Sequence, residues 1–382
     1  MKITDVRATL LRFDGPAWMD ALNVIGERRV VLVEVETDGG LVGLGEADAL
    51  GAGHLVAAAV EQDVRPLLVG QDPALIERLH DLLMRRLVLR ARRGPVMAAI
   101  AGVDIAVWDI FGKDVGRPVY QLLGGYRDRV AAYASGGFYA EGKGLDELAA
   151  EARGYVDRGF GAMKMKLGRR PHELLFGADR CRTAPRDDLE RVRVVREALG
   201  PDRALMVDVN TCWDVPTALR LGRQLEELDV AFLEEPISAD DVAGSARLAA
   251  ALDLPIAGYE TELSPAGFVD LIERGAIDVA QPDVIRTGGF TACRRIAAVA
   301  AARHMPIAPH AFASAVSTVA NLHFLASLPN GGLLEYCQYP GPLMDELLIG
   351  MPPVDADGTV ALPTGPGLGV ELNRAVVARF RV

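Results

Sequence analysis

Cysteine and basic residues are scarce in this chain of 382 residues, and each shortage excludes a class of protein. The four cysteines show neither CxxC spacing nor the density of a disulfide framework. The 41 lysines and arginines are outnumbered by 52 aspartates and glutamates, and no long block of one charge occurs. The net charge of −11 disfavours nucleic acid and anionic membrane surfaces as partners, so we expect a small-molecule ligand.

Long apolar runs and a secretory leader are also missing. Charged residues such as Asp104 and Arg303 interrupt every apolar segment before it approaches the roughly 20 residues that cross a bilayer. The N-terminal segment, which contains Asp5 and Asp14, has no signal-peptide core. Together with the lack of a disulfide pattern, these features predict a cytoplasmic protein without a membrane partner.

The length predicts two domains, and a hydrophobic content of 50% can fill a large core. Strand-like segments at residues 2–13 and 28–37, followed by an Asp38-Gly39-Gly40 turn, open the chain, and helical spacing then takes over. Strands alternating with helices follow. We therefore expect three parts: an α+β domain (residues 1–126), a barrel (127–342) and a tail that returns to the first domain (343–382).

Six side chains able to bind a metal or move a proton recur in the second half of the chain. They are separated by 26, 26, 23, 27 and 25 residues, and each ends a short apolar run: Asp208, Glu234, Glu260, Asp283, His310 and Glu335. A strand, a helix and two loops add up to roughly 25 residues. Because parallel strands of a barrel gather their carboxyl ends at one face, this repeat predicts an active site there.

Two lysines occupy a further strand, residues 161–168. Strand alternation places Lys164 and Lys166 on one face, so we expect both ammonium groups at the barrel mouth. Two like charges there depress each other's pKa toward values useful for a general base. The alternative is a solvated surface pair, which is disfavoured because lysine is normally excluded from a strand that is buried on both faces.

Asp208, Glu234 and Glu260 lie on successive predicted strands and form a candidate metal site. Three carboxylates without cysteine or histidine suit Mg²⁺, with Mn²⁺ as the alternative ion. Strand alternation aims only one of Glu234 and Glu235 inward. Asn210, two residues after Asp208, shares its face and is a candidate contact for the ligand. The alternative for the three carboxylates is a set of rim salt bridges with lysine or arginine.

His310 is the one histidine of six that ends an apolar strand, and Asp283 precedes it on the neighbouring strand. A carboxylate beside an imidazole fixes its tautomer and stabilises its charged form, as a general acid or base requires. Glu335, on the last strand, is a candidate hydrogen-bond donor to an oxyanion if its surroundings keep it protonated. An ordinary rim salt bridge is the alternative for Glu335.

These positions predict a reaction. A divalent cation that holds a substrate carboxylate makes the adjacent C–H bond acidic, and loss of that proton yields an enediolate. Lysine takes the proton from one face. An acid/base on the far face either returns a proton to the same carbon, which inverts it, or protonates a β-hydroxyl, which expels water. Racemisation and dehydration therefore use the same set of residues.

At these residues the chain resembles the enolase superfamily, and within it the mandelate racemase group, in which a lysine or histidine base works beside Mg²⁺. The resemblance spans nearly the whole chain. It rests on the order and spacing of KMK (164–166), DVN (208–210), EEP (234–236), Glu260, QPD with Thr287-Gly288-Gly289, APH ending at His310, Leu334-Glu335 and the stretch 103–125. One position departs from the pattern, because Tyr259 stands where the family usually has glycine before its third metal ligand.

The resemblance implies an α/β fold: a modified TIM barrel, (β/α)7β, under an α+β capping domain completed by the C-terminal tail. It implies Asp208, Glu234 and Glu260 as Mg²⁺ ligands and Lys166 as base with Lys164 as its pKa partner. The His310 and Asp283 dyad would be the second acid/base. The muconate-cycloisomerase branch, with its dipeptide epimerases, is disfavoured because that branch would place a lysine at Asp283.

A KxK motif combined with a His-Asp dyad resembles most the dehydratases of sugar acids, lyases that convert an aldonate or aldarate to a 2-keto-3-deoxy acid in carbohydrate catabolism. A racemase, epimerase or cycloisomerase that uses the same enediolate is the second candidate. A non-catalytic sugar-acid binder is the third, and the intact catalytic positions argue against it. Proteins similar to this one are commonly dimers or octamers, so we expect a homo-oligomer.

Substrate identity is expected to depend on two loops. One is residues 14–29, in which Trp18 and Asn23 are candidates to reach over the barrel mouth. The other, residues 169–188, is longer than a usual connection between strand and helix and is a candidate lid. Its charged residues either hold a distal carboxylate, which favours a diacid, or are ordinary solvated loop charges: Arg169, Arg170, His172 and Arg180.

Overall fold

The structure, a computed structural model, describes residues 1–169 and 185–382. It begins with an antiparallel sheet of three strands in chain order: β1 (Ile3–Met19), β2 (Val24–Thr37) and β3 (Val42–Ala47). The first two strands are long and form a hairpin paired along nearly its whole length. The predicted Asp38-Gly39-Gly40 turn joins β2 to β3, and Gly40 has the positive φ, 79°, that favours glycine.

Helices cover one side of this sheet and complete the N-terminal domain. They are α1 (Gly53–Ala58), the π-helical segment η1 (Ala59–Val64), α2 (Arg65–Leu68), α3 (Ile76–Arg86), α4 (Pro95–Val115) and α5 (Val119–Leu122). Helix α4 lies directly against β3, because glycine there leaves room for the helix backbone. A Cβ atom added at Gly45 would lie 2.0 Å from the carbonyl oxygen of Gly102.

Helix α4 is also apolar enough to be mistaken for a membrane span. It is 21 residues long and meets the length and composition of a spanning helix, so the prediction that no segment approaches this length is wrong. The two aspartates in this helix, Asp104 and Asp109, do not lower its mean hydropathy enough to exclude a membrane-spanning helix by composition. Because 89% of its most apolar window is buried inside the protein, α4 is the core helix of the first domain.

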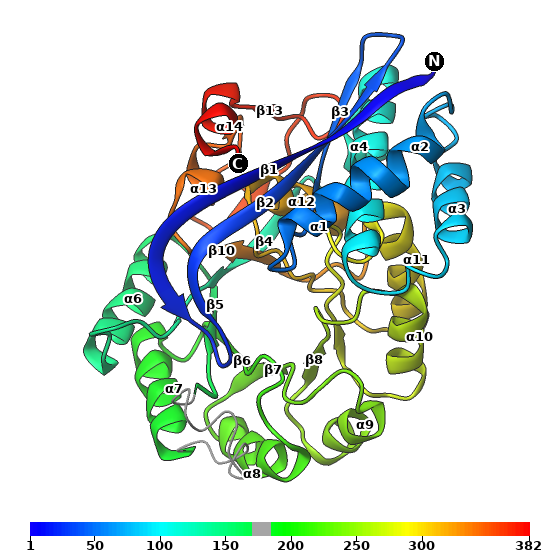
Figure 1. The fold of residues 1–382 in the computed structure, drawn as a ribbon. Helices are drawn as coiled ribbons and strands as arrows, with labels where there is room; N and C mark the ends of the chain where they lie inside the picture. Colours follow the sequence, from blue (N-terminus) through cyan, green and yellow to red (C-terminus); the bar gives the residue numbers. More distant parts are fainter. Residues whose placement is uncertain (170–184) are drawn as a thin grey trace.

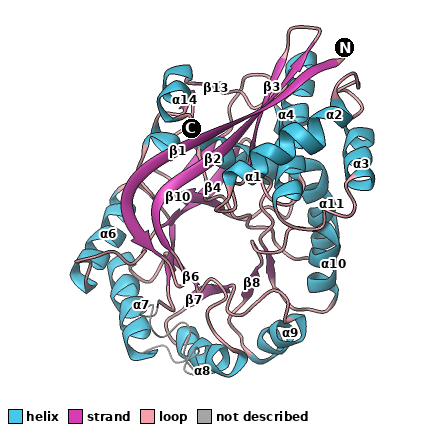
Figure 2. Cartoon of the chain, viewed as in Figure 1, coloured by secondary structure: helices cyan, strands magenta, loops and turns pink. Residues whose placement is uncertain are grey.

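The second sheet is parallel and curls into a barrel whose outside is covered by helices (Figures 1 and 2). Its strands are β4 (Arg129–Ser135), β5 (Ala162–Lys166), β6 (Ala204–Asp208), β7 (Val230–Glu234), β8 (Ile256–Gly258), β9 (Val279–Ala280) and β10 (Leu334–Cys337). The helices that alternate with them are α6 (Leu145–Asp157), α7 (Pro185–Leu199), α8 (Val215–Glu226), α9 (Val242–Ala251), α10 (Pro265–Glu273), α11 (Gly289–Ala302) and α12 (Ala315–Ala326).

The strand between α11 and α12 is reduced to one residue. Ile307 forms parallel bridges with Ala280 of β9 and with Gly331, just before β10. Strand β10 pairs in parallel with β4, which closes the barrel. Counting Ile307 as a strand, the described residues show the predicted (β/α)7β order under an α+β domain.

The C-terminal tail contacts both parts of the molecule. It contains α13 (Pro342–Asp345), β11 (Leu348–Ile349), β12 (Thr359–Ala361), β13 (Glu371–Leu372) and α14 (Arg374–Phe380). Strand β12 pairs with β4 of the barrel, and β11 pairs with β13. The chain then ends beside β1, where the backbone N–H of Val382 donates to the carbonyl oxygen of Leu10 at 3.1 Å (Figure 1).

Candidate active site

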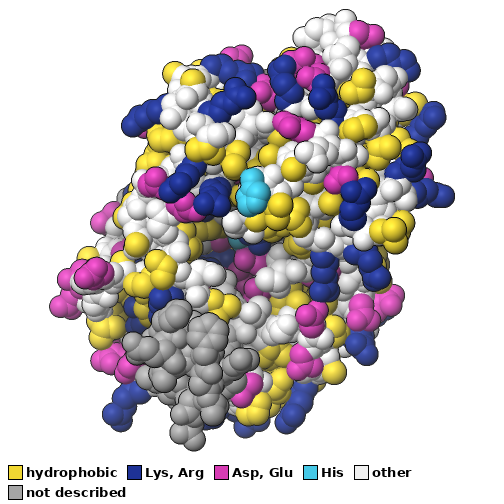
Figure 3. All heavy atoms as spheres, viewed as in Figure 1, with side chains coloured by type: hydrophobic (Ala, Val, Ile, Leu, Met, Phe, Trp, Pro, Cys, Tyr) yellow, Lys and Arg dark blue, Asp and Glu magenta, His cyan; other side chains and the backbone are white. Residues whose placement is uncertain are grey.

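A cavity of about 490 Å³ opens at the carboxyl ends of the barrel strands, beneath the hairpin of β1 and β2. Figure 3 shows this face of the molecule hollowed at its centre, with acidic side chains visible inside. The hairpin and the barrel both contribute to the wall. Among the lining residues are Asp20, Asn23 and Arg28 from the hairpin and Lys166, Asn210, Glu260, Arg286 and His310 from the barrel.

Two contacts hold the tip of the hairpin against the barrel. Met19 and Tyr139 exchange backbone hydrogen bonds of 2.8 and 2.9 Å. The guanidinium of Arg169 donates to the carbonyl oxygens of Asp20 and Asn23, each at 3.0 Å. Arg169, a predicted contact for a distal substrate carboxylate, is thus engaged by the hairpin backbone. The other residues of that prediction, Arg170, His172 and Arg180, lie outside the described residues.

Trp18 is not among the described residues that line the cavity. Its ring centroid lies 5.2 Å from that of Phe138 and 4.9 Å from that of Tyr339. The indole therefore packs behind the cavity wall and supports Phe138, which does line the cavity. The predicted direct contact of Trp18 with substrate is corrected accordingly, whereas Asn23, the other residue predicted from this loop, does line the cavity.

Lys164 and Lys166 lie in β5 and are 1% and 7% exposed. The Lys164 Nζ atom is 2.7 and 2.8 Å from the two carboxylate oxygens of Glu234 and 3.1 Å from Glu335 Oε1, whereas Lys166 pairs with Asp208. Burial lowers the pKa of both lysines, but these carboxylates raise it further, so each pKa lies above its ordinary value. Lys164 does lower the pKa of Lys166, as predicted, but Asp208 outweighs this effect, so the predicted net depression of the Lys166 pKa is wrong.

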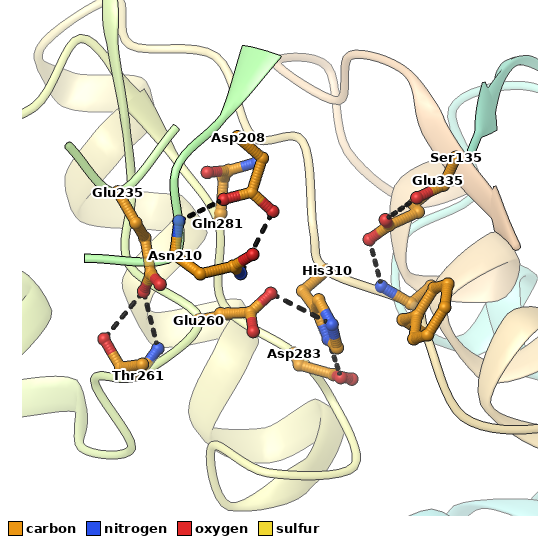
Figure 4. A network of polar contacts seen from close by, with 12 residues as sticks. Ser135, Asp208, Asn210, Glu235, Glu260, Thr261, Gln281, Asp283, His310 and Glu335 are labelled. Carbon is orange, nitrogen blue, oxygen red and sulfur yellow. Dashed lines mark hydrogen bonds and ion pairs between the residues drawn. The ribbon is translucent and has the colours of Figure 1, made fainter. Parts of the chain in front are cut away.

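The predicted metal ligands lie at neighbouring strand ends, and cationic groups of the chain engage each of them. Figure 4 shows two of the three, Asp208 and Glu260, with His310 beside Glu260. Asp208 ends β6, Glu234 ends β7, and Glu260 follows β8 by two residues. Besides the two lysine pairs, the carboxylate of Glu260 lies 3.0 Å from His310 Nε2 and 3.4 Å from Arg286 Nη1. Further donors complete the group: Asn210 Nδ2 to Asp208 at 3.2 Å and Gln281 Nε2 to Glu234 at 2.7 Å.

Glu235 faces the same group of carboxylates, contrary to the prediction that only one of the two adjacent glutamates points inward. Its side chain is 1% exposed and accepts hydrogen bonds from the backbone N–H and the hydroxyl of Thr261, at 3.0 and 2.6 Å. The reason is local, because Glu235 has a φ of 41° and strand alternation ends before it. Figure 4 shows Glu235 beside Glu260.

The structure brings His310 and Asp283 together. The Nδ1 atom of His310 lies 2.7 Å from Oδ2 of Asp283, whose other oxygen accepts from Asn321 Nδ2 at 3.1 Å. Burial and the charge of Arg286 lower the pKa of His310, but the Glu260 carboxylate and the hydrogen bond with Asp283 outweigh them and raise it to about 10. The imidazole is therefore protonated at neutral pH and can donate a proton into the cavity.

Glu335 is not the protonated donor that the sequence suggests. Burial raises its pKa, but the charges of Lys164, His310 and Lys166 outweigh burial and hold the pKa near 2. Its oxygens accept hydrogen bonds from the Ser135 hydroxyl at 2.6 Å and from a backbone N–H at 2.9 Å (Figure 4). Glu335 is therefore an ionised acceptor that helps to hold Lys164.

The carboxylates fit a divalent cation by donor type and by charge. In the part of the chain that the structure describes, no three Asp, Glu, His or Cys side chains stand as a ready metal site. The donors of Asp208, Glu234 and Glu260 are nonetheless all oxygens, as Mg²⁺ or Mn²⁺ prefers. Burial and the neighbouring carboxylates raise the pKa of Glu234 and Glu235 to about 8, and Lys164 and Lys166 oppose this shift only in part at Glu234. Oδ1 of Asn210 is also buried without a hydrogen-bond partner.

Arg286 and Asp48 are charged residues of the site that do not belong to the strand-end repeat of the sequence. Arg286 makes ion pairs with Asp48 of the N-terminal domain and with Glu260, and lies 3.8 Å from Asp283. The available signal is its position between the QPD motif, which ends at Asp283, and Thr287-Gly288-Gly289. Tyr259, the departure from the family pattern, points away from the cavity, and its hydroxyl lies 2.9 Å from Ser245 Oγ of α9.

Two family models match this chain. Residues 5–124 match the model described as mandelate racemase / muconate lactonizing enzyme, N-terminal domain. Residues 147–376 match the model described as enolase C-terminal domain-like. The two matches together cover most of the sequence.

Individual relatives are similar over their whole length. The arabinonate dehydratase of Saccharolobus solfataricus is 36% identical over 384 residues, which is 99% of each chain. The D-galactarolactone cycloisomerase of Agrobacterium fabrum is 35% identical over 398 residues, 100% of this chain and 99% of the relative. Among solved structures, a racemase from Streptomyces coelicolor A3(2) with bound magnesium matches with a TM-score of 0.87 and 31% identity over 100% of both chains.

Proposed function

The chain belongs to the mandelate racemase / muconate lactonizing enzyme family, and we propose that it is a dehydratase that removes water from a sugar acid. The product would be a 2-keto-3-deoxy acid. One observation carries the proposal: Lys166, at the end of β5, and His310, three residues after the bridged Ile307, line the same cavity. The name of the arabinonate dehydratase, which is 36% identical, supports the same chemistry.

Lys166 and His310 suit the two proton transfers of an elimination, one as base and the other as acid. Lys166, when neutral, takes the proton from the carbon next to the substrate carboxylate, and the electron pair left behind forms the enediolate. His310, held protonated by its acidic neighbours, donates a proton to the hydroxyl on the next carbon, which leaves as water. The resulting enol then rearranges to the ketone, so that the substrate has lost one water and nothing else.

The metal belongs to the same proposal. Asp208, Glu234 and Glu260 would hold Mg²⁺, and a structural relative contains bound magnesium. When bound, the ion supplies a Lewis acid for the substrate carboxylate and offsets the acidic charge that keeps Lys166 protonated. Asn210, which lines the cavity with an unpartnered Oδ1, is suited to receive a hydroxyl of the substrate.

A cycloisomerase or racemase that uses the same enediolate is the second candidate. The D-galactarolactone cycloisomerase, at 35% identity over the full chain, favours it. The two candidates separate by their products, because elimination removes water from a sugar acid whereas isomerisation changes only connectivity or configuration.

The decisive experiment is a library of five- and six-carbon aldonates and aldarates, incubated with the enzyme and Mg²⁺. Keto acid is detected as its semicarbazone, and the products are identified by NMR. We expect one or a few members to give a 2-keto-3-deoxy acid, with no product from the Lys166→Ala variant. Epimers without keto acid would move the assignment to the second candidate, and a fully unreactive library would contradict the dehydratase.

A further inference from the structure

Arg28 is a buried cation on the cavity wall, and no described carboxylate lies within ion-pair distance of it. It belongs to β2 of the hairpin and is only 7% exposed. Its Nη1 atom donates to the carbonyl oxygen of Phe312 at 2.9 Å, and Nη2 lies 3.7 Å from Cys337 Sγ, a weak acceptor. Its Nε atom is buried without a hydrogen-bond partner. Several N–H groups of the guanidinium therefore have no acceptor among the described residues.

An aromatic stack separates Arg28 from the reaction centre. The guanidinium lies 4.3 Å from the ring centroid of Phe312 and 4.6 Å from that of Tyr339. Phe312 stacks on Phe138 with centroids 5.3 Å apart, and Lys166 Nζ lies 5.3 Å from the Phe138 centroid. Arg28, Phe312, Phe138 and Lys166 all line the cavity. The cavity wall therefore carries two cations: Lys166 at the reaction centre, and Arg28 on the far side of the stacked rings of Phe138 and Phe312.

Among the described residues, the other charged side chains of the wall have partners of their own, and none of them neutralises Arg28. These pairs are Arg286 with Asp48 and Glu260, Arg29 with Glu27, His310 with Asp283, Lys166 with Asp208, and Asp20 with backbone N–H groups of its own turn. An unbalanced buried cation is costly unless an anion reaches it. The planar fork of a guanidinium matches a carboxylate, with which it forms charge-assisted hydrogen bonds.

We propose that Arg28 binds a second carboxylate of the substrate, so that the preferred substrates are aldarates, the dicarboxylic sugar acids. This inference rests on the proposed function and names its substrate class. The first carboxylate of the aldarate occupies the reaction centre near Lys166, and the hydroxylated carbons span the stacked rings. An aldonate ends in a neutral hydroxymethyl group at this position and leaves the charge of Arg28 unbalanced.

The test compares aldarates with aldonates of the same length and configuration, such as galactarate with galactonate and glucarate with gluconate. We expect the wild-type kcat/KM for the reactive aldarate to exceed that for its matched aldonate at least tenfold. Arg28→Gln should lower this ratio about 10- to 100-fold, because it removes a charge-assisted hydrogen bond to the distal carboxylate. Arg12→Gln is the matched control, since this arginine of the same hairpin already pairs with Asp14 and Glu27 and is not among the described residues that line the cavity, and the ratio should stay within about threefold.

A purely structural role of Arg28 in holding the Phe312 segment predicts equal losses for both members of a pair, and equal losses would overturn the inference. A wild-type preference for aldonates would overturn it as well. Should Arg28→Gln fail to fold, Arg28→Lys, which keeps the charge and loses the fork, must still lower the ratio.

A binding measurement that requires no turnover can test the role of Arg28 separately from the proposed dehydratase activity. In the presence of Mg²⁺, an aldarate should raise the wild-type Tm more than its matched aldonate, and Arg28→Gln should abolish the difference. If that pattern appears while no keto acid forms, only the dehydratase assignment fails. If no aldarate raises the Tm above its matched aldonate and none is turned over in preference to it, the role of Arg28 in binding is refuted.

Discussion

The imidazole of His310 is held by Asp283 through a 2.7 Å contact between Nδ1 and Oδ2. Asp283 cannot turn away, because Asn321 and a backbone N–H donate to its other oxygen at 3.1 Å each. The opposite ring nitrogen, Nε2, therefore points toward the cavity side at Glu260. The arrangement defines which atom of His310 can exchange a proton with a ligand.

Replacement of Asp283 by Asn should lower kcat by about 10²- to 10⁴-fold, because the imidazole loses the partner that fixes its tautomer and charge. The hydrogen bond with Asp283 also raises the pKa of His310. The variant should therefore lose activity at lower pH than the wild type as His310 deprotonates. The measurement is kcat against pH. Asp278→Asn, at the other end of the barrel, serves as control, and a profile shared by all three proteins would exclude Asp283 from this role.

Lys166→Ala and His310→Ala should separate the two proton transfers. In D₂O, His310→Ala should still exchange the hydrogen next to the carboxylate, because Lys166 remains, but should not release water. Lys166→Ala should lose both exchange and dehydration. Exchange is followed by ¹H NMR and dehydration by keto-acid formation. Near-native kcat in either variant would remove that residue from its proposed role.

Glu260→Gln should weaken Mg²⁺ binding at least about tenfold, because one of three carboxylate ligands loses its charge. Titration calorimetry measures this without turnover. Glu262→Gln is the matched control, since Glu262 is also buried but pairs with Arg93 outside the cavity. Removal of the metal by a chelator should abolish activity, and full activity after chelation would refute the metal assignment.

Acid should destabilise the fold through His323. Burial lowers its pKa from 6.5 to about 4, and the hydrogen bond to the Leu368 carbonyl opposes this only in part. The unfolded chain therefore binds the proton more readily than the folded one. The stabilising contribution is complete above about pH 6.5 and is lost as the pH falls toward 4, by roughly 3 kcal/mol.

The test of this prediction is urea unfolding between pH 7 and pH 4.5. His323→Asn keeps an acceptor for the Tyr120 N–H and cannot be protonated. The variant should be less stable than the wild type at pH 7, but its free energy of unfolding should fall less steeply with acid. Parallel curves for the two proteins would show that His323 does not set the slope.

The strand-end residues could be predicted because a barrel imposes them. The spacing from Asp208 to Glu335 reflects a repeated strand, helix and loop, so periodicity alone locates the side chains that meet in the cavity. The predicted family and fold are confirmed by the family models and by the structural relative. The segment at Ile307 shows where periodicity no longer predicts a regular strand. Only Ile307 forms strand bridges there, yet His310 still follows it closely at the position that the repeat predicts.

Residues of the site that lie outside the strand-end repeat could not be predicted from that repeat. Asp48 and Arg28 reach the cavity only through the docking of the first domain, which leaves no periodic signal, and Arg286 lies in the barrel but three residues beyond the strand-end position of Asp283. The same holds for pKa directions, because the lysine pair suggests mutual repulsion until Asp208 and Glu234 are seen at ion-pair distance. The loop position of Trp18 predicts a contact with substrate, whereas aromatic packing with Phe138 and Tyr339 turns the side chain behind the cavity wall.

The hairpin of β1 and β2 touches the barrel through backbone groups at its tip, at Met19, Asp20 and Asn23. This anchoring at the tip does not depend on the side chains of Met19 and Asn23, although Arg28, farther along β2, also donates through its side chain to the carbonyl oxygen of Phe312. The loop can therefore acquire new side chains by mutation while the groups that transfer protons stay unaltered. Exchange of residues 20–28 between relatives is accordingly the shortest route to redirecting this catalyst toward another sugar acid.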